Sequence, residues 1–344
     1  MTDTRIPIVL LTGFLGSGKT TLLNRLIHQP EFAECAVIIN EFGAIGLDQA
    51  LVADRSDDQD IQLLDSGCLC CLASSDVQNV LGSLYYRRLR QEIPYFKRVL
   101  IETSGLAEPG PIINSILGDG SLNQQYRIAG IITVLDSLHA QNDIAQYPEA
   151  EQQLMMADAL VLTKFETTPE HDRSAHEKKL RQWLQKRNPT AHVLDSRQPD
   201  SELAAQMIAL VDGALIDHRP DTPASSTAAV SNQSEPHEHL AQHDINSVVH
   251  EITHPVCWPA WAQFVQFVQQ NLSEHLLRFK GILAFEQADN PMMVHAVHHL
   301  FSPPEAAGIA SAQLCGQIVF IFTGPQQQKI TEAVALLEPS SSAH

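Results

Sequence analysis

The stretch GFLGSGKTT, Gly13–Thr21, decides how the N-terminal half of this sequence folds. It follows an apolar run at residues 6–12 and leads into a helical pattern at residues 18–28, so it forms a turn from a strand into a helix. The spacing G-x-x-x-x-G-K-[ST] is typical of a phosphate-binding loop, because glycines let backbone N–H groups face phosphate oxygens at a helix N-terminus. A glycine-rich turn without a ligand is the alternative, and the full match in its proper context favours the phosphate loop.

The residues of this loop have separate expected roles. The Lys19 ammonium would reach the β- and γ-phosphates, and the Thr20 hydroxyl would ligate Mg²⁺. The loop therefore predicts a nucleoside triphosphate with Mg²⁺ as its ligand. The predicted contacts to the nucleotide come from Gly13, Phe14, Leu15, Gly16, Ser17, Gly18, Lys19, Thr20 and Thr21.

Further apolar runs rich in β-branched residues continue the strand pattern, with helical stretches between them. The strands are expected at 35–40, 98–103, 128–136 and 158–164, and the clearest helices at 74–91 and 175–186. Apolar strands that alternate with helices are typical of a parallel sheet covered on both faces. We therefore predict an α/β fold, with a doubly wound P-loop NTPase domain and a mostly parallel sheet.

The composition changes in the C-terminal third of the chain. Residues 219–247 are rich in Pro, Ser and Ala and lack apolar periodicity, which predicts a flexible linker between a first domain at 1–218 and a second at 248–338. The second domain begins with a strand pattern and a helix from 261 to 276, and we expect a smaller α+β unit with a mostly antiparallel sheet. Its later strands are expected at 281–286, 292–301 and 317–324, followed by a helix at 326–337.

The overall composition excludes several classes of protein. The chain has 344 residues, of which 44% are hydrophobic and 18% charged, as in ordinary globular proteins of two domains. The formal net charge of −18 repels phosphate backbones, so we expect no nucleic-acid partner. The N-terminal apolar run is too short to span a bilayer and lacks a small-residue cleavage site, so we expect no membrane contact and a cytoplasmic location.

A second motif, ETSG, completes the predicted phosphate site. Glu102 ends an apolar strand and supplies the carboxylate expected on the Mg²⁺ side, together with Thr20. Gly105 would present its N–H to the γ-phosphate and sense its loss. A carboxylate that caps a helix is the alternative for Glu102. The predicted catalytic residues are Lys19, Thr20, Glu102 and Gly105.

The base site is predicted at LTKFE, which contributes Thr163, Lys164 and Glu166. The aliphatic part of Lys164 would cover a purine ring, and a carboxylate two residues later would accept hydrogen bonds from the N–H groups of guanine. Asp is the usual acid in this role, and Glu166 is one methylene longer. We predict GTP as the nucleotide on this match.

The stretch DSGCLCC places Cys68, Cys70 and Cys71 within four residues. Thiols stay reduced in a cytoplasm, and thiolates suit Zn²⁺, Co²⁺, Ni²⁺ or Cu⁺. In an extended chain Cys68 and Cys70 face one way and Cys71 the other, so they converge on a metal only through a turn. The fourth position would be taken by water, by Glu41 or by a recipient protein. A redox dithiol and three small buried side chains are the alternatives.

At this point the sequence resembles the CobW-like metallochaperone GTPases, a P-loop family related to GTPases of urease and hydrogenase maturation. The resemblance rests on GFLGSGKTT, NEFGAIGLD, GCLCC, ETSGLAEP and LTKFE in this order, and continues through LRFKGIL, VHAVHHLF and IVFIFTG. It implies GTP binding and slow hydrolysis coupled to loading or release of a transition metal. By position, Gly13–Thr21 would take the triphosphate and Glu102 the Mg²⁺ side. The transferable metal would be held by Cys68, Cys70 and Cys71, with Glu41 of the NEFG segment.

The predicted function is therefore a GTP hydrolase that carries Zn²⁺, or Co²⁺ or Ni²⁺, to a metal-requiring client protein that the sequence does not name. A small-molecule kinase and a non-hydrolysing GTP-binding zinc buffer or sensor are the alternatives. A kinase would need a basic lid, for which residues 85–88 are the only candidate. The chain would act as a monomer or as a nucleotide- or metal-dependent dimer. Metal scavenging and simple solvation remain equal interpretations of the linker histidines His237, His239 and His243.

Overall fold

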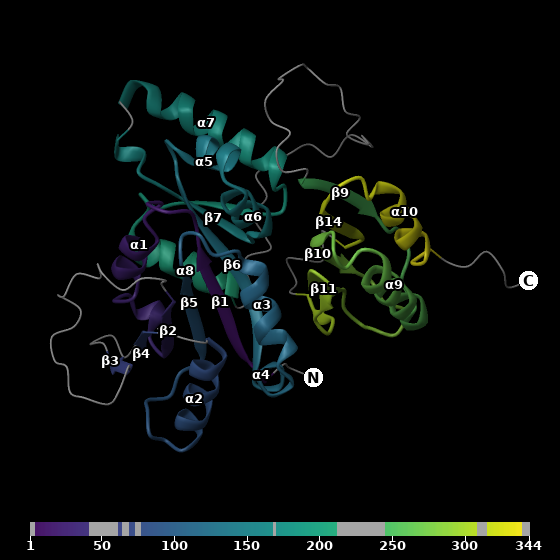
Figure 1. The fold of residues 1–344 in the computed structure, drawn as a ribbon, viewed down its shortest axis with the longest axis horizontal. Coiled ribbons are helices and arrows are strands. Elements are labelled where there is room, and N and C mark those ends of the chain that lie inside the picture. Colours follow the sequence, from purple (N-terminus) through teal and green to yellow (C-terminus); the bar gives the residue numbers. More distant parts are fainter. Residues whose placement is uncertain are drawn as a thin grey trace, which may run out of the picture.

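The computed structural model of the chain describes residues 4–40, 61–63, 69–72, 77–167, 170–211, 245–307 and 315–338. Figure 1 shows two units side by side, a larger N-terminal one and a smaller C-terminal one. The first contains a mainly parallel sheet between layers of helices, and the second an antiparallel sheet with helices on one face. The predicted fold class is confirmed.

The first sheet has eight strands in the order β3-β4-β2-β5-β1-β6-β7-β8. Neighbouring strands are parallel except for β3 and β4, which are antiparallel. The carboxyl ends of the parallel strands therefore meet at one edge of the sheet. The strands are β1 (Ile6–Thr12), β2 (Cys35–Asn40), β3 (Ile61–Leu63), β4 (Leu69–Leu72), β5 (Arg98–Thr103), β6 (Tyr126–Asp136), β7 (Ala159–Thr163) and β8 (His192–Asp195).

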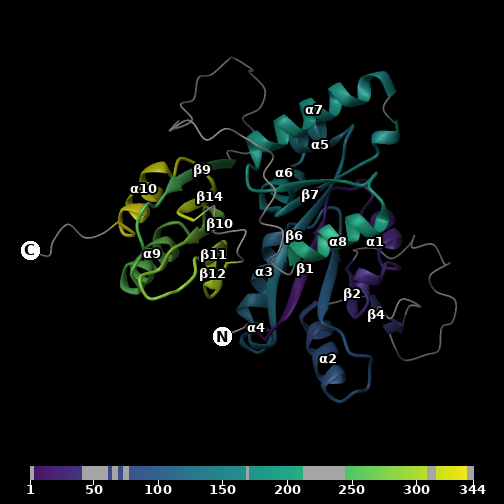
Figure 2. The ribbon, with the colours of Figure 1, turned by 180° about the vertical axis from the view of Figure 1, so that it is seen from behind.

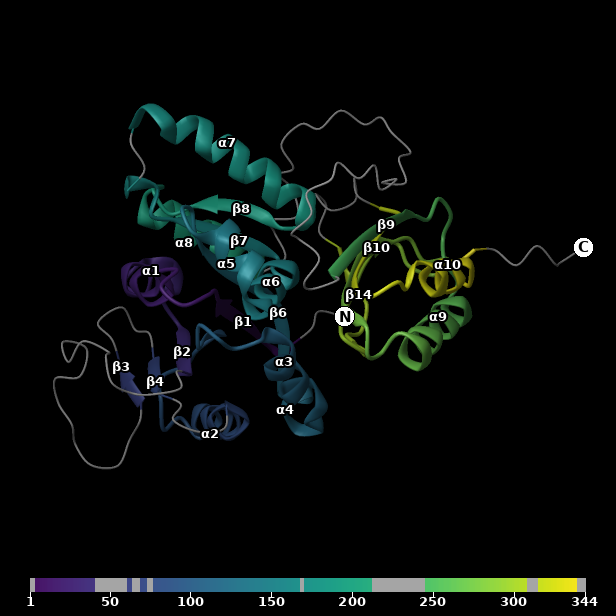
Figure 3. The ribbon, with the colours of Figure 1, turned by 45° about the horizontal axis from the view of Figure 1, so that its top comes forward.

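Helices cover both faces of this sheet because alternate residues of its central strands point to opposite sides. In β1, Ile8 and Leu10 pack in one apolar cluster with α2 and α3, whereas Val9 and Leu11 pack in another with α1 and α8. Figures 2 and 3 show these helices on their separate faces. The helices are α1 (Lys19–Leu26), α2 (Val77–Leu89), α3 (Pro109–Gly118), α4 (Gly120–Gln125), α5 (Ala140–Gln146), α6 (Pro148–Met156), α7 (Glu170–Arg187) and α8 (Asp200–Val211).

The C-terminal unit contains a second sheet in the order β12-β11-β10-β14-β9, with β13 paired to β11. Helices α9 and α10 cover one face and enclose an aromatic core around Phe264, Phe279 and Phe320. The elements are β9 (Ile245–Glu251), α9 (Trp258–Asn271), β10 (Leu276–Leu283), β11 (Met292–Val297), β12 (Leu300–Phe301), β13 (Glu305–Ala306), β14 (Gln317–Thr323) and α10 (Gln327–Ala335).

Two predictions about this unit need adjustment. The helix expected from 261 to 276 ends at Asn271, and Leu276 already begins β10. Val268, Leu272 and Leu276 are all buried and follow one another every fourth residue, so the helical pattern continues past the end of α9 into the first residue of β10. The first strand of the unit begins at Ile245, ahead of the expected domain start at 248. None of the described helices has the length and apolar character needed to cross a membrane.

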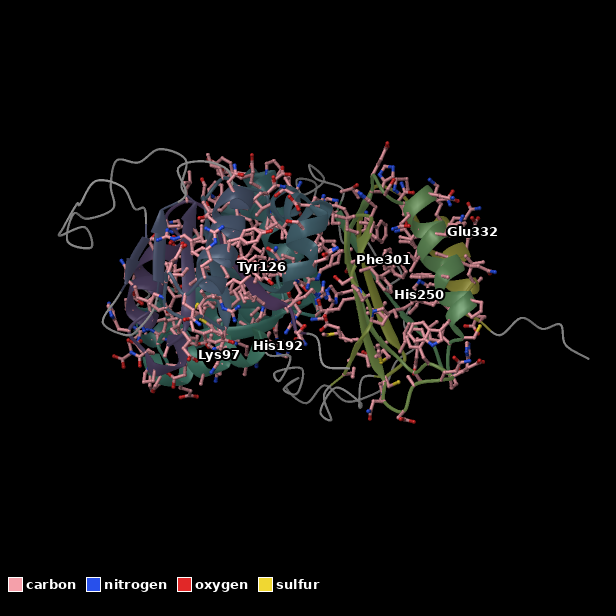
Figure 4. The ribbon with its side chains drawn as sticks, turned by 90° about the horizontal axis from the view of Figure 1, so that it is seen from below. Lys97, Tyr126, His192, His250, Phe301 and Glu332 are labelled. Atoms are coloured by element: carbon pink, nitrogen blue, oxygen red, sulfur yellow. The ribbon has the colours of Figure 1, made fainter. Side chains whose placement is uncertain are left out.

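The two units meet through a charged contact beside an apolar one. Arg278 of β10 donates to the carbonyl oxygen of Met156 and to the carboxylate of Asp158, and Lys280 Nζ lies 2.9 Å from Asp158 Oδ1. Burial opposes ionisation of Asp158, but Arg278 and Lys280 outweigh it, so its pKa is strongly lowered. Met155 packs with Leu277 and two residues of β14. In Figure 4 side chains of both units occupy the boundary between the labelled Tyr126 and Phe301.

Acid should weaken this interface through His295, which pairs with Lys280 in the register of β11 and β10. Burial first, and the charge of Arg278 next, lower the pKa of His295 to about 4 from an ordinary value of 6.5. Between these values the unfolded chain binds a proton that the folded chain does not, so the free energy of unfolding should fall as the pH drops from 6.5 to 4. Urea unfolding of wild type and His295→Gln across this range measures the effect.

The exposed residue His299, four positions after His295, provides the control for this test. His299→Gln should keep the pH dependence of the wild type, whereas His295→Gln should have a shallower one. Identical slopes for wild type and His295→Gln would show that His295 does not contribute.

Candidate functional site

The loop between β1 and α1 has the backbone shape of an anion-binding turn. Gly13 and Gly18 have φ values of 143° and 94°, a region that favours glycine. A Cβ on Gly13 would also clash with the carbonyl oxygen of Val134 in β6. The loop therefore folds closely against the sheet at the carboxyl end of β1, and α1 points its N-terminus at the same place.

Lys19 lies in the centre of this loop. Its side chain is largely buried, and Nζ donates to the carbonyl oxygens of Gly13 at 2.8 Å and Phe14 at 3.3 Å. A buried ammonium group that is held by loop carbonyls provides a fixed positive charge where phosphate oxygens would lie.

Thr20 and Glu102 come together from two different elements. Thr20 Oγ1 donates to Glu102 Oε1 at 2.6 Å, and Glu102 is only 1% exposed at the end of β5. The next residue, Thr103, donates from its hydroxyl to Thr12 Oγ1 at 2.9 Å, which fixes the end of β5 to the end of β1. A hydroxyl and a carboxylate are the oxygen ligands that Mg²⁺ prefers, so this pair fits the predicted metal.

The turn after β5 approaches the phosphate loop closely. A Cβ on Gly105 would lie 2.7 Å from Leu15 Cδ2 and 2.9 Å from the backbone N and Cα of Leu15. Only glycine allows two backbone segments to come this close. The structure thus places Gly105 against the phosphate loop.

Two of the three predicted base residues also contact this loop. Thr163 Oγ1 donates to the Ser17 carbonyl oxygen at 2.7 Å, and Lys164 Nζ donates to the Gly16 carbonyl oxygen at 2.5 Å. Glu166 is exposed in the short 3₁₀ turn Phe165–Thr167 and makes neither of these two hydrogen bonds.

Asp136 is a site residue that the motifs do not reveal. Its Oδ2 accepts hydrogen bonds from Lys164 Nζ at 2.8 Å and from His139 Nδ1 at 3.0 Å, and Oδ1 accepts one from the Leu138 N–H. Burial opposes ionisation, but these bonds outweigh it and lower the pKa of Asp136. A signal was present, because Asp136 ends a buried strand at the same edge of the sheet as Glu102.

Only part of the predicted transition-metal site can be placed. Cys70 and Cys71 lie in β4, whose backbone pairs with Val37 and Ile38 of β2. Cys68 and Glu41 lie outside the described residues, as do the linker histidines. Elsewhere in the described part of the chain, no group of three or more His, Cys, Asp or Glu side chains could hold a metal ion.

The tryptophans at the start of α9 serve the packing of the C-terminal unit. Trp261 is buried in the aromatic core, and Trp258 stacks on Phe285 with 4.3 Å between ring centroids. His254 Nε2 lies 2.8 Å from a carboxylate oxygen of Glu338.

Family models cover most of the chain. The model for the CobW/HypB/UreG nucleotide-binding domain matches residues 7–195. The chain belongs to the CobW/HypB/UreG family. A second model, for the cobalamin synthesis protein cobW C-terminal domain, matches residues 245–337. The resemblance predicted from the sequence is confirmed.

Individual relatives are similar over different lengths. The zinc chaperone YjiA of Escherichia coli is 31% identical over 297 residues, which are 86% of this chain and 87% of that protein. Zinc-regulated GTPase metalloprotein activator 1 of Schizosaccharomyces pombe is 29% identical over 196 residues, which are 56% of this chain and 46% of that protein. A crystal structure described as Zn(II)-bound YjiA GTPase from E. coli covers 98% of this chain and 100% of that chain, with 28% identity and a TM-score of 0.70.

The ion pair between Asp136 and Lys164 provides a test of this site. Asp136→Asn should weaken nucleotide binding about tenfold, roughly 1.4 kcal/mol, because Lys164 loses its charged partner. Titration with a fluorescent GDP analogue measures this. Asp119→Asn is the matched control, because Asp119 only caps α4 and Asn caps helices equally well. Equal affinity of Asp136→Asn and wild type would remove Asp136 from the site.

Proposed function

We propose that this chain is a GTP-hydrolysing metal chaperone that delivers a transition metal, zinc in first place, to a client protein. The observation that carries the nucleotide part is the 2.6 Å hydrogen bond between Thr20 and Glu102 beside a phosphate loop that Gly105 touches. Relatives named zinc chaperone and GTPase support the metal and the reaction. The protein would act in the cytoplasm, with units at 1–218 and 248–338 joined by a linker at 219–247.

The nucleotide would bind along the edge where the strands end. The loop Gly13–Thr21 would hold the phosphates through its N–H groups, with Lys19 on the β- and γ-phosphates. Thr163, Lys164 and Glu166 would contact the guanine base. Asp136 would hold Lys164 in place, because a lysine paired on two sides keeps one orientation.

Hydrolysis would depend on charge neutralisation and position more than on proton transfer. Thr20 and Glu102 would hold Mg²⁺, directly or through water, and the ion would neutralise charge on the β- and γ-phosphates. The Gly105 N–H would bond the γ-phosphate, and loss of that phosphate would release the turn after β5. We expect slow turnover, because neither Lys19 nor Glu102 is placed to act as a general base toward water.

The sheet supports coupling between the nucleotide and the thiol segment. Ile39 of β2 pairs with Glu102 of β5 on one side and with Leu72 of β4 on the other. Neighbouring strands lie about 4.8 Å apart, so the strand with Cys70 and Cys71 runs about 10 Å from the strand that carries Glu102. Cys68, Cys70 and Cys71, with Glu41 just beyond β2, would form the metal site in the GTP-bound state.

One relative shows why the thiols need a direct test. A structure of YjiA in which a glutamate and two cysteines are replaced by alanine is still described as Zn(II)-bound. For this chain, bound zinc alone does not identify the thiol site, and its dependence on nucleotide is the informative quantity.

Zinc affinity should therefore depend on the nucleotide. With Mg²⁺ and a non-hydrolysable GTP analogue, competition against a zinc indicator should give an affinity at least about tenfold higher than with GDP, because a ligand shifts an equilibrium by its differential affinity. The triple variant with Cys68, Cys70 and Cys71 changed to Ser should lose this difference but still bind GTP.

Two further variants test whether the change in zinc affinity depends on bound nucleotide and on the three clustered thiols. Lys19→Ala should lose nucleotide binding and with it the change in zinc affinity. Cys315→Ser, which alters an exposed cysteine elsewhere, should behave like the wild type. A wild type with one zinc affinity in both nucleotide states contradicts the coupling, and absence of steady-state GTP hydrolysis at saturating zinc would indicate a buffer or sensor instead.

A further inference from the structure

Helix α6 contacts the phosphate loop, the turn after β5 and the C-terminal unit. Tyr147, at its N-terminal end, stacks on Phe14 of the phosphate loop with 4.6 Å between ring centroids. Gln153, in its middle, reaches the turn after β5. Met155 and Met156, at its C-terminal end, contact the C-terminal unit. Figures 1 and 3 show α6 and α3 on the side of the first unit that faces the second.

The contact of Gln153 with the turn is buried and specific. Its side chain is fully buried, and Nε2 donates to the carbonyl oxygens of Gly105 at 3.1 Å and Ala107 at 3.0 Å. The backbone carbonyl oxygen of Gln153 accepts a hydrogen bond from Thr133 Oγ1 at 2.7 Å, which attaches this part of α6 to β6. Two bonds from one amide make the position of the turn and the position of α6 depend on each other.

The amide of Gln153 also has capacity for a second arrangement. Its Oε1 is buried and accepts no hydrogen bond from the residues that the structure describes. A buried acceptor without a bond is unfavourable, so a movement that brings an N–H of the turn toward it gains a bond. A second arrangement of this kind is what a switch at the turn would require.

The far end of α6 is attached to the C-terminal unit by directional bonds. Arg278 bonds the carbonyl oxygen of Met156 and the carboxylate of Asp158, and Lys280 bonds the same carboxylate at 2.9 Å. Asp158 Oδ2 in turn accepts the Ile131 N–H at 2.9 Å. These bonds attach β10 to the last residue of α6 and to the segment that directly follows it.

A second contact reaches the C-terminal unit from the other side of the same turn. Helix α3 begins at Pro109, directly after the turn, and a Cβ on Gly110 would clash with Nε2 of His298. His298 occupies the bend between β11 and β12 with a φ of 50°. The C-terminal unit thus contacts both the helix that holds the turn and the helix that continues from it.

We propose that Gln153 is a positioning residue that makes α6 follow the turn at Gly105, so that the nucleotide state sets the orientation of the C-terminal unit. This inference rests on the proposed function, since it requires a turn that responds to the γ-phosphate. The client would then meet the C-terminal unit in one orientation with GTP and in another with GDP.

Hydrogen exchange on the full chain tests this inference, with Mg²⁺ and either GDP or a non-hydrolysable GTP analogue. In the wild type, exchange should differ between the two nucleotides at residues 102–109 and at residues 276–301. In Gln153→Met, which keeps the volume but cannot donate, the difference at 102–109 should remain and that at 276–301 should disappear. The GTPase kcat should fall about 10- to 100-fold from misplacement of the turn, with KM within about threefold of the wild type.

Matched variants separate position from general damage. Gln152→Met changes the same residue type on the same helix, at a side chain that is only partly buried, and should leave both exchange differences intact. Arg278→Met removes the bonds to Met156 and Asp158 at the C-terminal end of α6. Only the exchange difference at 276–301 should then be lost, and the rate of GTP hydrolysis should not change.

Gln153→Glu adds a signature that structural damage alone does not produce. A protonated carboxyl group can donate one hydrogen bond to the turn, whereas a carboxylate repels both carbonyl oxygens. Burial should raise the pKa of this carboxyl group, so the exchange difference at 276–301 should be present at low pH and lost as pH rises. In the wild type this difference should not fall as the pH rises, because His295 weakens the interface only toward acid pH, and in Gln153→Met the difference should be absent at every pH.

The outcomes distinguish this inference from the proposed function. No nucleotide-dependent difference at 102–109 in the wild type would contradict both. A difference at 102–109 without one at 276–301 in the wild type, or its survival at 276–301 in Gln153→Met, would overturn the inference alone. If Gln153→Met does not fold, the pH dependence of Gln153→Glu and the result for Arg278→Met decide in its place.

Discussion

The backbone of Gly105 lies so close to the phosphate loop that one added carbon would come within 2.9 Å of the N and Cα of Leu15. This close approach depends on the sheet, because β1 and β5 are neighbours and pair from Ile8 with Val99 to Leu11 with Glu102. It makes the turn after β5 and the phosphate loop one continuous surface. In the proposed switch, a change in the charge of a bound phosphate would therefore reach the turn without any long path.

Two routes lead from this turn to the rest of the molecule. Across the sheet, β2 separates β5 from β4, so the strand that carries Cys70 and Cys71 is two positions from Glu102. Along the opposite direction, Gln153 and α6 connect the turn to Asp158 and the C-terminal unit. A nucleotide switch placed between a thiol segment and a second unit can act on metal affinity and on client contact at once.

The sequence predicts the central sheet and the phosphate loop because buried parallel strands and glycine spacing are local signals. It does not reveal Asp136 or Gln153, whose roles come from neighbours far along the chain, Lys164 and Gly105. The sequence also does not predict the short edge strand β8, whose residues are only partly buried. The expected helix runs on to Leu276 because Val268, Leu272 and Leu276 keep a spacing of four residues into the start of β10.

A pair of crystal structures, one with Mg²⁺ and a non-hydrolysable GTP analogue and one with GDP, tests the central role of the turn most directly. We expect the Gly105 N–H within about 3 Å of a γ-phosphate oxygen in the first, with Thr20 and Glu102 at the metal, and a displaced turn in the second. A turn in the same position in both structures, with Gly105 beyond hydrogen-bonding distance of the γ-phosphate, would contradict a nucleotide switch at this site.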